Sequence, residues 1–259
     1  MIVICLEGCH GCGKSTLTEL FFSLGYQTLD EAFLNMPSVP SMSPQTMLME
    51  SVWIGNWFVR LLNLAEDKNN DQVFIADRSP FSAVCYAGKH GKLLEPVIRA
   101  QMDEVLAAAN IEIYSVHLEV DSEILWSRIS SRLIQEPGRV AYDEDKREHM
   151  DKINEFYEGF EWDFTVDNSG EDGRKVVDDI LKGVGELSEK FKEYNQLNST
   201  CLKDLKSEQP KTSAVTPIPN KKLEDKFNDC VLIDEEKKEK EELYAVASPT
   251  TVVTAWLEA

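Results

Sequence analysis

The chain has 259 residues, of which 46 are Asp or Glu and 27 are Lys or Arg, so its formal net charge is -19 at pH 7. Nucleic-acid backbones and anionic membrane surfaces would repel a protein this acidic, which excludes both as expected partners. The sequence also lacks a run of about 18 apolar residues, the length that a membrane-spanning helix requires. The remaining expectation is a globular protein that binds a small molecule.

The first predicted element is a buried strand, residues 2–6, which is apolar and rich in β-branched side chains. A glycine-rich stretch follows, and then a helix that ends before Gly25. The stretch fits G-x-x-x-x-G-K-[ST] at every fixed position, which predicts a loop whose backbone amides hold the phosphates of a nucleoside triphosphate. We expect Lys14 to contact the β- and γ-phosphates and Ser15 to bind Mg²⁺. The residues predicted to bind nucleotide here are Gly8, Cys9, His10, Gly11, Cys12, Gly13, Lys14, Ser15 and Thr16.

The cysteines favour a reducing, cytoplasmic setting, because six are few for this length. Met1 leads directly into the first strand, so we expect no signal peptide. Cys9 and Cys12 have the C-x-x-C spacing of redox or zinc sites, but no second cysteine or histidine pair lies near them in the sequence. We therefore interpret both as variable positions of the phosphate loop and expect no zinc.

A second strand is predicted over residues 26–29, and Asp30 and Glu31 follow it. Acids at the carboxyl end of a strand in an open α/β sheet lie where ligands bind. The alternative is a solvated pair of acids that opens the proline-containing loop over residues 35–44.

The next predicted element is a long helix over residues 45–67, with aromatic and apolar side chains at three- and four-residue steps. Such a stripe is usually core. The alternative is that Trp53 or Trp57 stacks on a base, with Asn56 or Arg60 supplying polar contacts.

A third buried strand, residues 73–76, is followed by Asp77. An acid in this place can hold Mg²⁺ directly or through water, whereas the simpler interpretation is an ion pair that caps the strand. A short helical turn over residues 81–88 then carries Ser82 and Tyr86.

The remaining elements continue the alternation, which predicts a parallel sheet with helices on both faces. They are a helix over residues 92–110, a strand over 111–118, a helix from about 121 to the break at 137, a helix over 143–159, a strand over 163–167 and a last helix over 173–194. We predict one domain over residues 1–194 and a tail over residues 195–259, whose composition is typical of disorder.

Three segments together resemble the thymidylate kinase and deoxynucleoside kinase superfamily: Leu6-Glu7-Gly8, Asp77-Arg78-Ser79 and Arg128-x-x-x-Arg132. The resemblance covers about residues 1–187. It implies a P-loop α/β three-layer sandwich with a five-stranded parallel sheet, ordered 2-3-1-4-5, and an arginine-bearing lid. It also implies ATP and Mg²⁺, and a small-molecule nucleoside or nucleotide substrate; a homodimer is left open.

The resemblance assigns roles to individual residues. Glu31 resembles the acid that accepts the proton of the attacking hydroxyl, and Arg78 resembles the arginine that holds the acceptor. Arg128, Arg132 and Arg139 resemble lid arginines that close over the transferred phosphoryl group, and the segment Val166-Asp167-Asn168-Ser169-Gly170 resembles the turn that cradles adenine.

The expected catalytic residues are Lys14, Glu31, Asp77, Arg78, Arg128 and Arg132. The expected cofactor-binding residues outside the loop are Arg139, Asn168 and Ser169. The expected substrate-binding residues are Glu31, Trp53, Trp57, Arg60, Arg78, Ser82 and Tyr86, and the expected metal ligands are Ser15 and Asp77.

Departures from the family pattern limit how precisely the resemblance predicts the substrate. Thymidylate kinases usually carry Asp where this loop has His10, and an Arg near Asp30-Glu31-Ala32. Deoxynucleoside kinases usually carry Glu in place of Asp77. We expect phosphoryl transfer from ATP to a nucleoside or nucleoside monophosphate, with the thymidine or thymidylate type favoured. The alternatives are a non-catalytic, nucleotide-binding regulatory protein and a kinase of another small metabolite.

Overall fold

The protein was analysed as a computed structural model, which describes residues 1–31, 45–66 and 72–195. The chain divides into two units, Met1–Leu205 and Lys206–Ala259, and every described residue belongs to the first. The predicted tail therefore lies outside the described residues except for Asn195, and the domain boundary at 194/195 stays a prediction. None of the described helices is both long and apolar enough to cross a bilayer.

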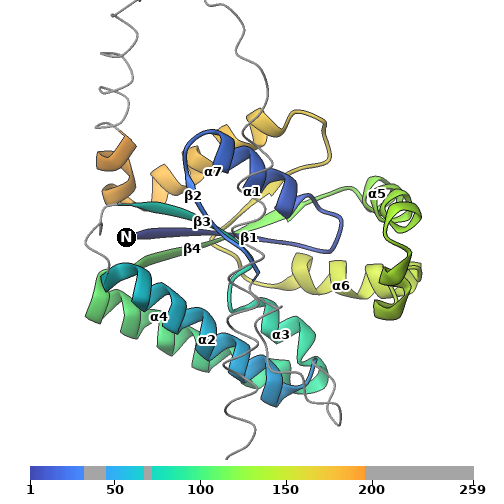
Figure 1. The fold of residues 1–259 in the computed structure, drawn as a ribbon, viewed down its shortest axis with the longest axis horizontal. Coiled ribbons are helices and arrows are strands. Elements are labelled where there is room, and N and C mark those ends of the chain that lie inside the picture. Colours follow the sequence, from blue (N-terminus) through green and yellow to red (C-terminus); the bar gives the residue numbers. More distant parts are fainter. Residues whose placement is uncertain (32–44, 67–71, 196–259) are drawn as a thin grey trace, which may run out of the picture. The chain divides into compact units, whose positions relative to one another are not determined.

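Five parallel strands form one sheet, in the order β2-β3-β1-β4-β5 (Figure 1). This order confirms the predicted P-loop fold. The strands are β1 Ile2–Glu7, β2 Gln27–Leu29, β3 Val73–Asp77, β4 Glu112–Glu119 and β5 Phe164–Asp167. The helices are α1 Lys14–Ser23, α2 Met47–Glu66, α3 Ser82–Tyr86, α4 Glu95–Ala109, α5 Ser122–Gln135, α6 Arg147–Gly159 and α7 Gly173–Leu187, with the 3₁₀ helices η2 Gly88–Leu93 and η3 Pro137–Tyr142.

Each face of the sheet packs against a hydrophobic core. Successive side chains of a strand point to opposite faces, so the side chains of β1 alternate between the two cores. Ile2, Ile4 and Leu6 join a core that includes side chains of α1, α5, α6 and α7. Val3 and Cys5 join a second core with side chains of α2, α3 and α4. Figure 1 shows α1 and α7 on one side of the sheet and α2 and α4 on the other.

The helix predicted over residues 92–110 is preceded by a separate 3₁₀ helix, η2, and α4 itself starts only at Glu95. Pro96 occupies the first turn of α4, where its missing amide hydrogen has no cost. Gly91 lies so close to α3 that a Cβ there would be 1.8 Å from the carbonyl oxygen of Val84. The helical periodicity could not reveal this tight turn.

The helix predicted over residues 143–159 begins later, at Arg147. Before it, residues Pro137–Tyr142 form η3, and Asp143 ends η3 in the left-handed conformation, with φ 60°. A left-handed residue cannot continue a right-handed helix, so the chain re-enters helical geometry only after it.

The helix predicted over residues 173–194 breaks at Ser188, and a second helical segment follows over residues 189–195. Ser188 has an extended backbone, with φ -117° and ψ 114°, and its hydroxyl accepts a hydrogen bond of 3.0 Å from the amide of Phe191. The same hydroxyl donates to Glu112 of β4. Ser188 therefore caps the new helix and attaches it to the sheet.

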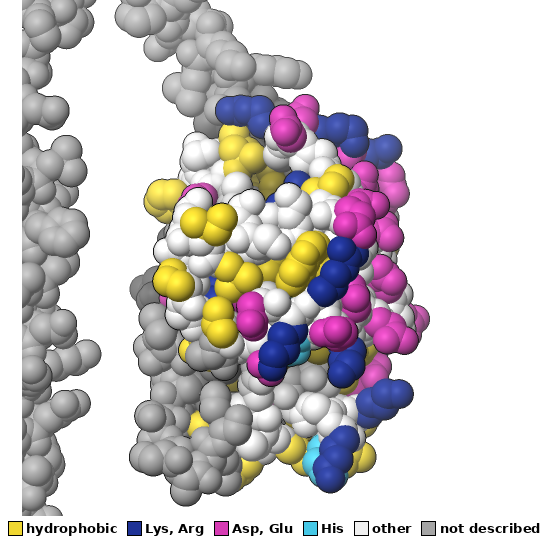
Figure 2. Space-filling view, turned by 90° about the vertical axis from the view of Figure 1, so that its right-hand side faces the viewer, with side chains coloured by type: hydrophobic (Ala, Val, Ile, Leu, Met, Phe, Trp, Pro, Cys, Tyr) yellow, Lys and Arg dark blue, Asp and Glu magenta, His cyan; other side chains and the backbone are white. Residues whose placement is uncertain are grey.

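The surface agrees with the acidic composition. Figure 2 shows Asp and Glu side chains crowded along one side of the face in view, with Lys and Arg side chains scattered between them. A long-range field of this sign repels phosphates, so an anionic ligand needs local cations and amides to bind.

Candidate active site

The phosphate loop connects β1 to α1 and uses left-handed glycines that L-residues tolerate poorly. Gly13 has φ 100° and precedes the first residue of α1, and a Cβ on it would lie 2.7 Å from Nδ2 of Asn168. Gly11 has φ 84°, and a Cβ there would lie 2.7 Å from Ile129. No side chain caps the amino end of α1. Its first amides are therefore available for an anion, which suits a phosphate.

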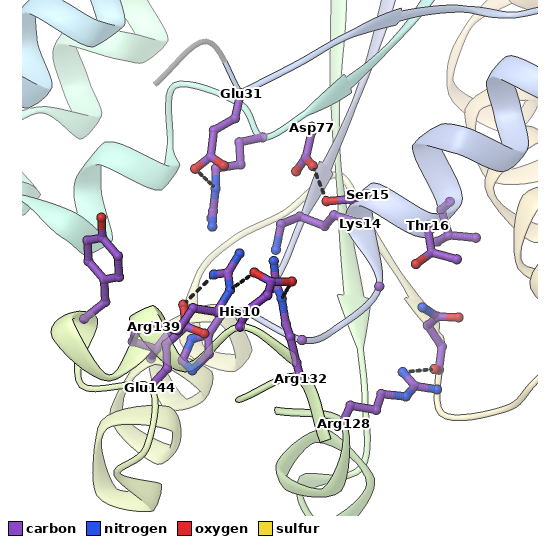
Figure 3. Close-up of a pocket in the computed structure, with 18 of the residues that line it drawn as sticks. His10, Lys14, Ser15, Thr16, Glu31, Asp77, Arg128, Arg132, Arg139 and Glu144 are labelled. Carbon is purple, nitrogen blue, oxygen red and sulfur yellow. Dashed lines mark hydrogen bonds and ion pairs between the residues drawn. The ribbon is translucent and has the colours of Figure 1, made fainter. Parts of the chain in front are cut away.

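Lys14 is the first residue of α1, and its side chain bends back over the phosphate loop (Figure 3). Nζ donates hydrogen bonds to the carbonyl oxygens of Gly8, at 2.7 Å, and Cys9, at 3.1 Å. The side chain is buried. Its charge is thus held at the loop, where the β- and γ-phosphates are expected.

Ser15 and Asp77 meet across the carboxyl edge of the sheet, because β3 pairs with β1 and sets Leu6 beside Asp77. The Ser15 hydroxyl donates to Oδ2 of Asp77 at 2.9 Å, while Oδ1 of Asp77 is buried without a hydrogen-bond partner. A hydroxyl and a carboxylate oxygen suit Mg²⁺. Among the described residues no cluster of three or more His, Cys, Asp or Glu side chains suits a metal, so phosphate oxygens and water would complete its coordination.

Arg78 follows Asp77 with a left-handed backbone, φ 79°, and a guanidinium that is almost fully buried. Nε donates to Oε1 of Glu31 at 2.5 Å. Another nitrogen of the same group donates to Ser82, at 3.3 Å, and to the hydroxyl of Tyr157, at 3.2 Å. The guanidinium lies 5.1 Å from the ring centroid of Tyr86. This network orients the arginine and Glu31 together.

Glu7 is a residue of this network for which the sequence predicted no role. Its fully buried carboxylate accepts hydrogen bonds of 2.7 Å from both the amide and the hydroxyl of Ser79, and one of 2.8 Å from Ser82. Burial raises the pKa of Glu7, while Arg78 and the Ser79 donors oppose that rise. Glu7 thereby holds the turn that carries Arg78. The available signal was its position at the end of a buried strand, directly before the loop.

Glu50 of α2 is a second acid that the sequence did not single out. Its side chain is 2 % exposed, and its Oε1 atom has no hydrogen-bond partner. Burial raises its pKa to about 8, with Glu31 adding to the rise and Arg78 opposing it. At neutral pH Glu50 is therefore mostly protonated.

Arg132 and Arg139 line the opposite side of the same cavity. Arg132 pairs with Glu136 at 3.1 Å, and Arg139 pairs with Glu136 at 2.5 Å and with Glu144 at 2.9 Å (Figure 3). Both arginines belong to the segment of α5 and η3 that the resemblance treats as a lid. Closure of such a lid stays a prediction.

Arg128 also lines the cavity, but its guanidinium holds a different part of the fold. It donates to the carbonyl oxygens of Asn168, at 2.9 Å, Gly170, at 3.2 Å, and Ser169, at 3.5 Å. Nδ2 of Asn168 in turn donates to the carbonyl oxygen of Cys12 at 2.7 Å. Arg128 therefore connects α5, the turn after β5 and the phosphate loop.

His10 faces His149 of α6, with ring centroids 5.8 Å apart. Burial, together with the neighbouring His149, Lys14, Arg78 and Arg132, lowers the pKa of His10 to about 3. The ring is therefore neutral near pH 7, and it adds no charge to the cavity floor.

A single cavity of about 1020 Å³ brings most of the predicted site residues together. This volume lies at the upper end of the range for small-molecule sites, which leaves room for a donor and an acceptor at once. The predicted residues that line it are His10, Gly11, Gly13, Lys14, Ser15, Thr16, Glu31, Asp77, Arg78, Tyr86, Arg128, Arg132, Arg139 and Asn168. Gly8, Cys9, Cys12, Ser82 and Ser169 lie in the same loops and networks but are not among its lining residues.

The tryptophans of α2 belong to the core and are not among the lining residues. The indole nitrogen of Trp53 donates to the carbonyl oxygen of Glu31 at 3.0 Å, so Trp53 positions the backbone of that acid. Arg60 pairs with Asp30 at 2.6 Å, outside the lining. This geometry favours the core interpretation of Trp53 and Trp57, and their contact with a substrate stays a prediction.

The structural comparisons found similar solved chains at low identity. A deoxyadenosine kinase from M. mycoides, with dCMP and a flexible dCDP bound, is 18 % identical with a TM-score of 0.47, and the match covers 71 % of this chain and 99 % of that chain. The YorR protein from Bacillus subtilis, in complex with phosphorylated GDP, is 23 % identical with a TM-score of 0.43, covering 71 % and 95 %. A gluconokinase from Sinorhizobium meliloti 1021 is 17 % identical with a TM-score of 0.43, covering 75 % and 96 %.

The sequence comparisons gave one family and no individual relative. No curated protein matches the chain. A family model described as "AAA domain" matches residues 3–172, which span the phosphate loop, the five strands and the helices between them. The chain belongs to this AAA domain family.

Proposed function

We propose that the protein transfers the γ-phosphoryl group of ATP to a nucleoside or nucleoside monophosphate. The observation that carries the proposal is the shared cavity, which joins the phosphate loop at Lys14 to the Glu31–Arg78 pair. A nucleotide-binding protein that only senses ATP needs the loop, whereas a transferase also needs a polar site for an acceptor beside it.

The donor half of the proposal rests on the loop and its neighbours. The amides before α1 and the ammonium of Lys14 bind the phosphates, and the turn held by Arg128 provides one wall for the base. Mg²⁺, held by Ser15 and Asp77, would neutralise charge that develops on the phosphates. Arg132 and Arg139 exchange their carboxylate partners for phosphoryl oxygens when the donor binds.

The acceptor half rests on Glu31 and Arg78. Arg78 orients Glu31, and Tyr86 forms a further part of the lining at this end. We propose thymidine and thymidylate as the first acceptors to test, because of the sequence resemblance. We also propose a cytoplasmic setting, in which the described cysteines stay free thiols, as they are in this structure; monomeric and dimeric forms both suit the proposal.

The test is ATP consumption by the purified full-length protein, with and without nucleosides and monophosphates. We expect consumption to depend on an acceptor, and we expect Lys14→Met to reduce it by about 10³-fold or more. Lys152→Met, at an exposed position on α6, is the matched control and should keep the wild-type rate. If ATP binds but no acceptor stimulates its consumption, the protein is a nucleotide-binding regulator. If only a different metabolite stimulates it, the protein is a kinase of that metabolite.

A further inference from the structure

The charges at the acceptor end of the cavity are already balanced within the protein. We define this end as Glu31, Arg78 and Tyr86, with Glu7 and Glu50 buried behind them. Resting on the kinase function proposed above, we infer that the acceptor is an uncharged hydroxyl compound, a nucleoside, rather than a monophosphate or another anion.

The guanidinium at this end is already paired with a carboxylate. Arg78 pairs with Glu31 at 2.5 Å and also donates to Ser82 and Tyr157. Arg60 pairs with Asp30 and is not a lining residue. The undescribed residues 32–44 contain no Lys, Arg or His, so this segment adds no cation. An anionic acceptor at Arg78 would therefore have to compete with Glu31 for the charge of the guanidinium.

The buried acids set the sign of the local charge. The Arg78–Glu31 pair carries no net charge by itself, so ionisation of either Glu7 or Glu50 makes this end of the cavity anionic. A phosphate placed here would then face like charges, which disfavours its binding. The charge is thus neutral or negative in every protonation state of the two buried acids.

The cations on the other side do not remove this difficulty. Lys14, Arg132 and Arg139 line the donor side, where the triphosphate of ATP has to be neutralised. A monophosphate acceptor would compete with ATP for the same three groups. A hydroxyl acceptor makes no such demand.

A hydroxyl acceptor also uses what Glu31 offers. Oε1 is bound to Arg78, and among the described residues no hydrogen bond is made by Oε2. Oε2 takes the proton of the acceptor hydroxyl while its oxygen bonds to the γ-phosphorus, and the bond from that phosphorus to the bridging oxygen of ADP breaks. The products are a phosphate monoester, ADP and one proton, which Glu31 releases to water.

The first experiment compares acceptors of equal base and sugar. With the full-length protein, ATP and Mg²⁺, we expect kcat/KM for one or more nucleosides to exceed that for the matching 5′-monophosphate by about 100-fold or more. Gluconate, an anion with hydroxyl groups, serves as a third arm and should give no turnover. A monophosphate or gluconate that turns over faster than every nucleoside overturns this inference and leaves the kinase function standing. Absence of any acceptor-dependent turnover overturns both.

The second experiment changes the charge balance directly. Glu31→Gln keeps the shape and frees the charge of Arg78, so calorimetry should show monophosphate affinity rising relative to nucleoside affinity by about tenfold or more. Asp30→Asn is the matched control, because it frees Arg60 outside the cavity lining and should leave the ratio within about twofold. An unchanged ratio in Glu31→Gln, with the protein folded, contradicts the charge argument.

Discussion

Two buried carboxyl groups near Arg78 are accommodated in different ways. The carboxylate of Glu7 accepts hydrogen bonds from Ser79 and Ser82. These bonds offset part of the cost of burying a polar group. Glu50 has an oxygen without a partner, and it avoids the cost of a buried charge by keeping its proton. Burial raises the pKa of both acids, but hydrogen-bond donors oppose that rise only at Glu7.

Glu50 makes the stability of the protein fall as pH rises. Its pKa is about 8 in the folded protein, against 4.5 as its ordinary value, so unfolding releases a proton between these pH values. Below about pH 4.5 Glu50 is protonated in both states and does not lower the free energy of unfolding. Between about pH 4.5 and pH 8 that free energy falls progressively, by on the order of 4 kcal/mol. Glu50→Gln should remove the loss, so its stability advantage over wild type should grow from pH 5 to pH 8 in urea unfolding.

Glu104→Gln is the control for that measurement, because Glu104 is exposed on α4. It should follow the wild-type pH dependence. A constant difference between Glu50→Gln and wild type at all pH values would show that Glu50 is already ionised in the folded protein.

At the residue scale, the sequence predicted the groups whose chemistry belongs to a fixed spacing. One local pattern contains the loop glycines, Lys14 and Ser15, so these residues could be predicted without any knowledge of tertiary contacts. Glu7 and Glu50 were missed, because a lone glutamate in a strand or helix is usually exposed. Their burial depends on the packing of α2 and β3, which no local pattern records.

At the element scale, Arg128 joins three segments that are distant in the sequence. A helix, α5, is attached through it to the turn after β5, and Asn168 of that turn reaches the phosphate loop. In the proposed function, such a connection would position the backbone around the base of the nucleotide rather than around the transferred phosphoryl group. It can be distinguished from the lid role that the resemblance implies.

Arg128→Ala should therefore raise KM for ATP by about tenfold and leave kcat within a few-fold, because its loss loosens the turn without removing charge at the γ-phosphate. Arg128→Lys should recover part of the affinity, since an ammonium group can still donate to a carbonyl oxygen. Steady-state kinetics measure both constants. A fall in kcat of about 100-fold with KM unchanged would instead support direct contact with the phosphoryl group.

Helix ends mark the limit of prediction at this scale. Apolar periodicity located α2, α5 and α7, but it ran through Ser188 without a break because apolar residues continue beyond it. The break depends on the Ser188 hydroxyl, which meets Glu112 of β4 and the amide of Phe191. A contact with a distant strand cannot be inferred from spacing within the helix.

At the scale of the whole molecule, the described part of the chain has a further packing contact after α7. The segment over residues 189–195 inserts Phe191, which is 0 % exposed, into the core that also contains α7. The alternation of strands and helices predicted the parallel sheet, and the family resemblance supplied its order. The insertion of Phe191 had no comparable signal, since the sequence predicted one continuous helix over residues 173–194 and did not show which side chains after Ser188 turn into the core.

Phe191→Ala should lower the free energy of unfolding by about 3–5 kcal/mol, through lost burial and the cavity that remains. Phe22→Ala is the matched control, because Phe22 is 66 % exposed on α1 and its truncation should change stability by about 0.5 kcal/mol or less. Denaturant unfolding followed by tryptophan fluorescence measures both. Equal effects would show that residues 189–195 do not pack as the structure has them.

The hydrogen bonds of Lys14 have a consequence for how fast a phosphate can bind at the loop. Since its ammonium group rests on two main-chain oxygens, it was stripped of hydration when the chain folded rather than when the ligand arrives. An incoming phosphate thus swaps one set of oxygen neighbours for another, and little solvent has to be rearranged around the cation. The cost is that the resting protein has to hold a largely dehydrated positive group, through the carbonyl dipoles of Gly8 and Cys9 and a contact of 3.6 Å with Sγ of Cys12.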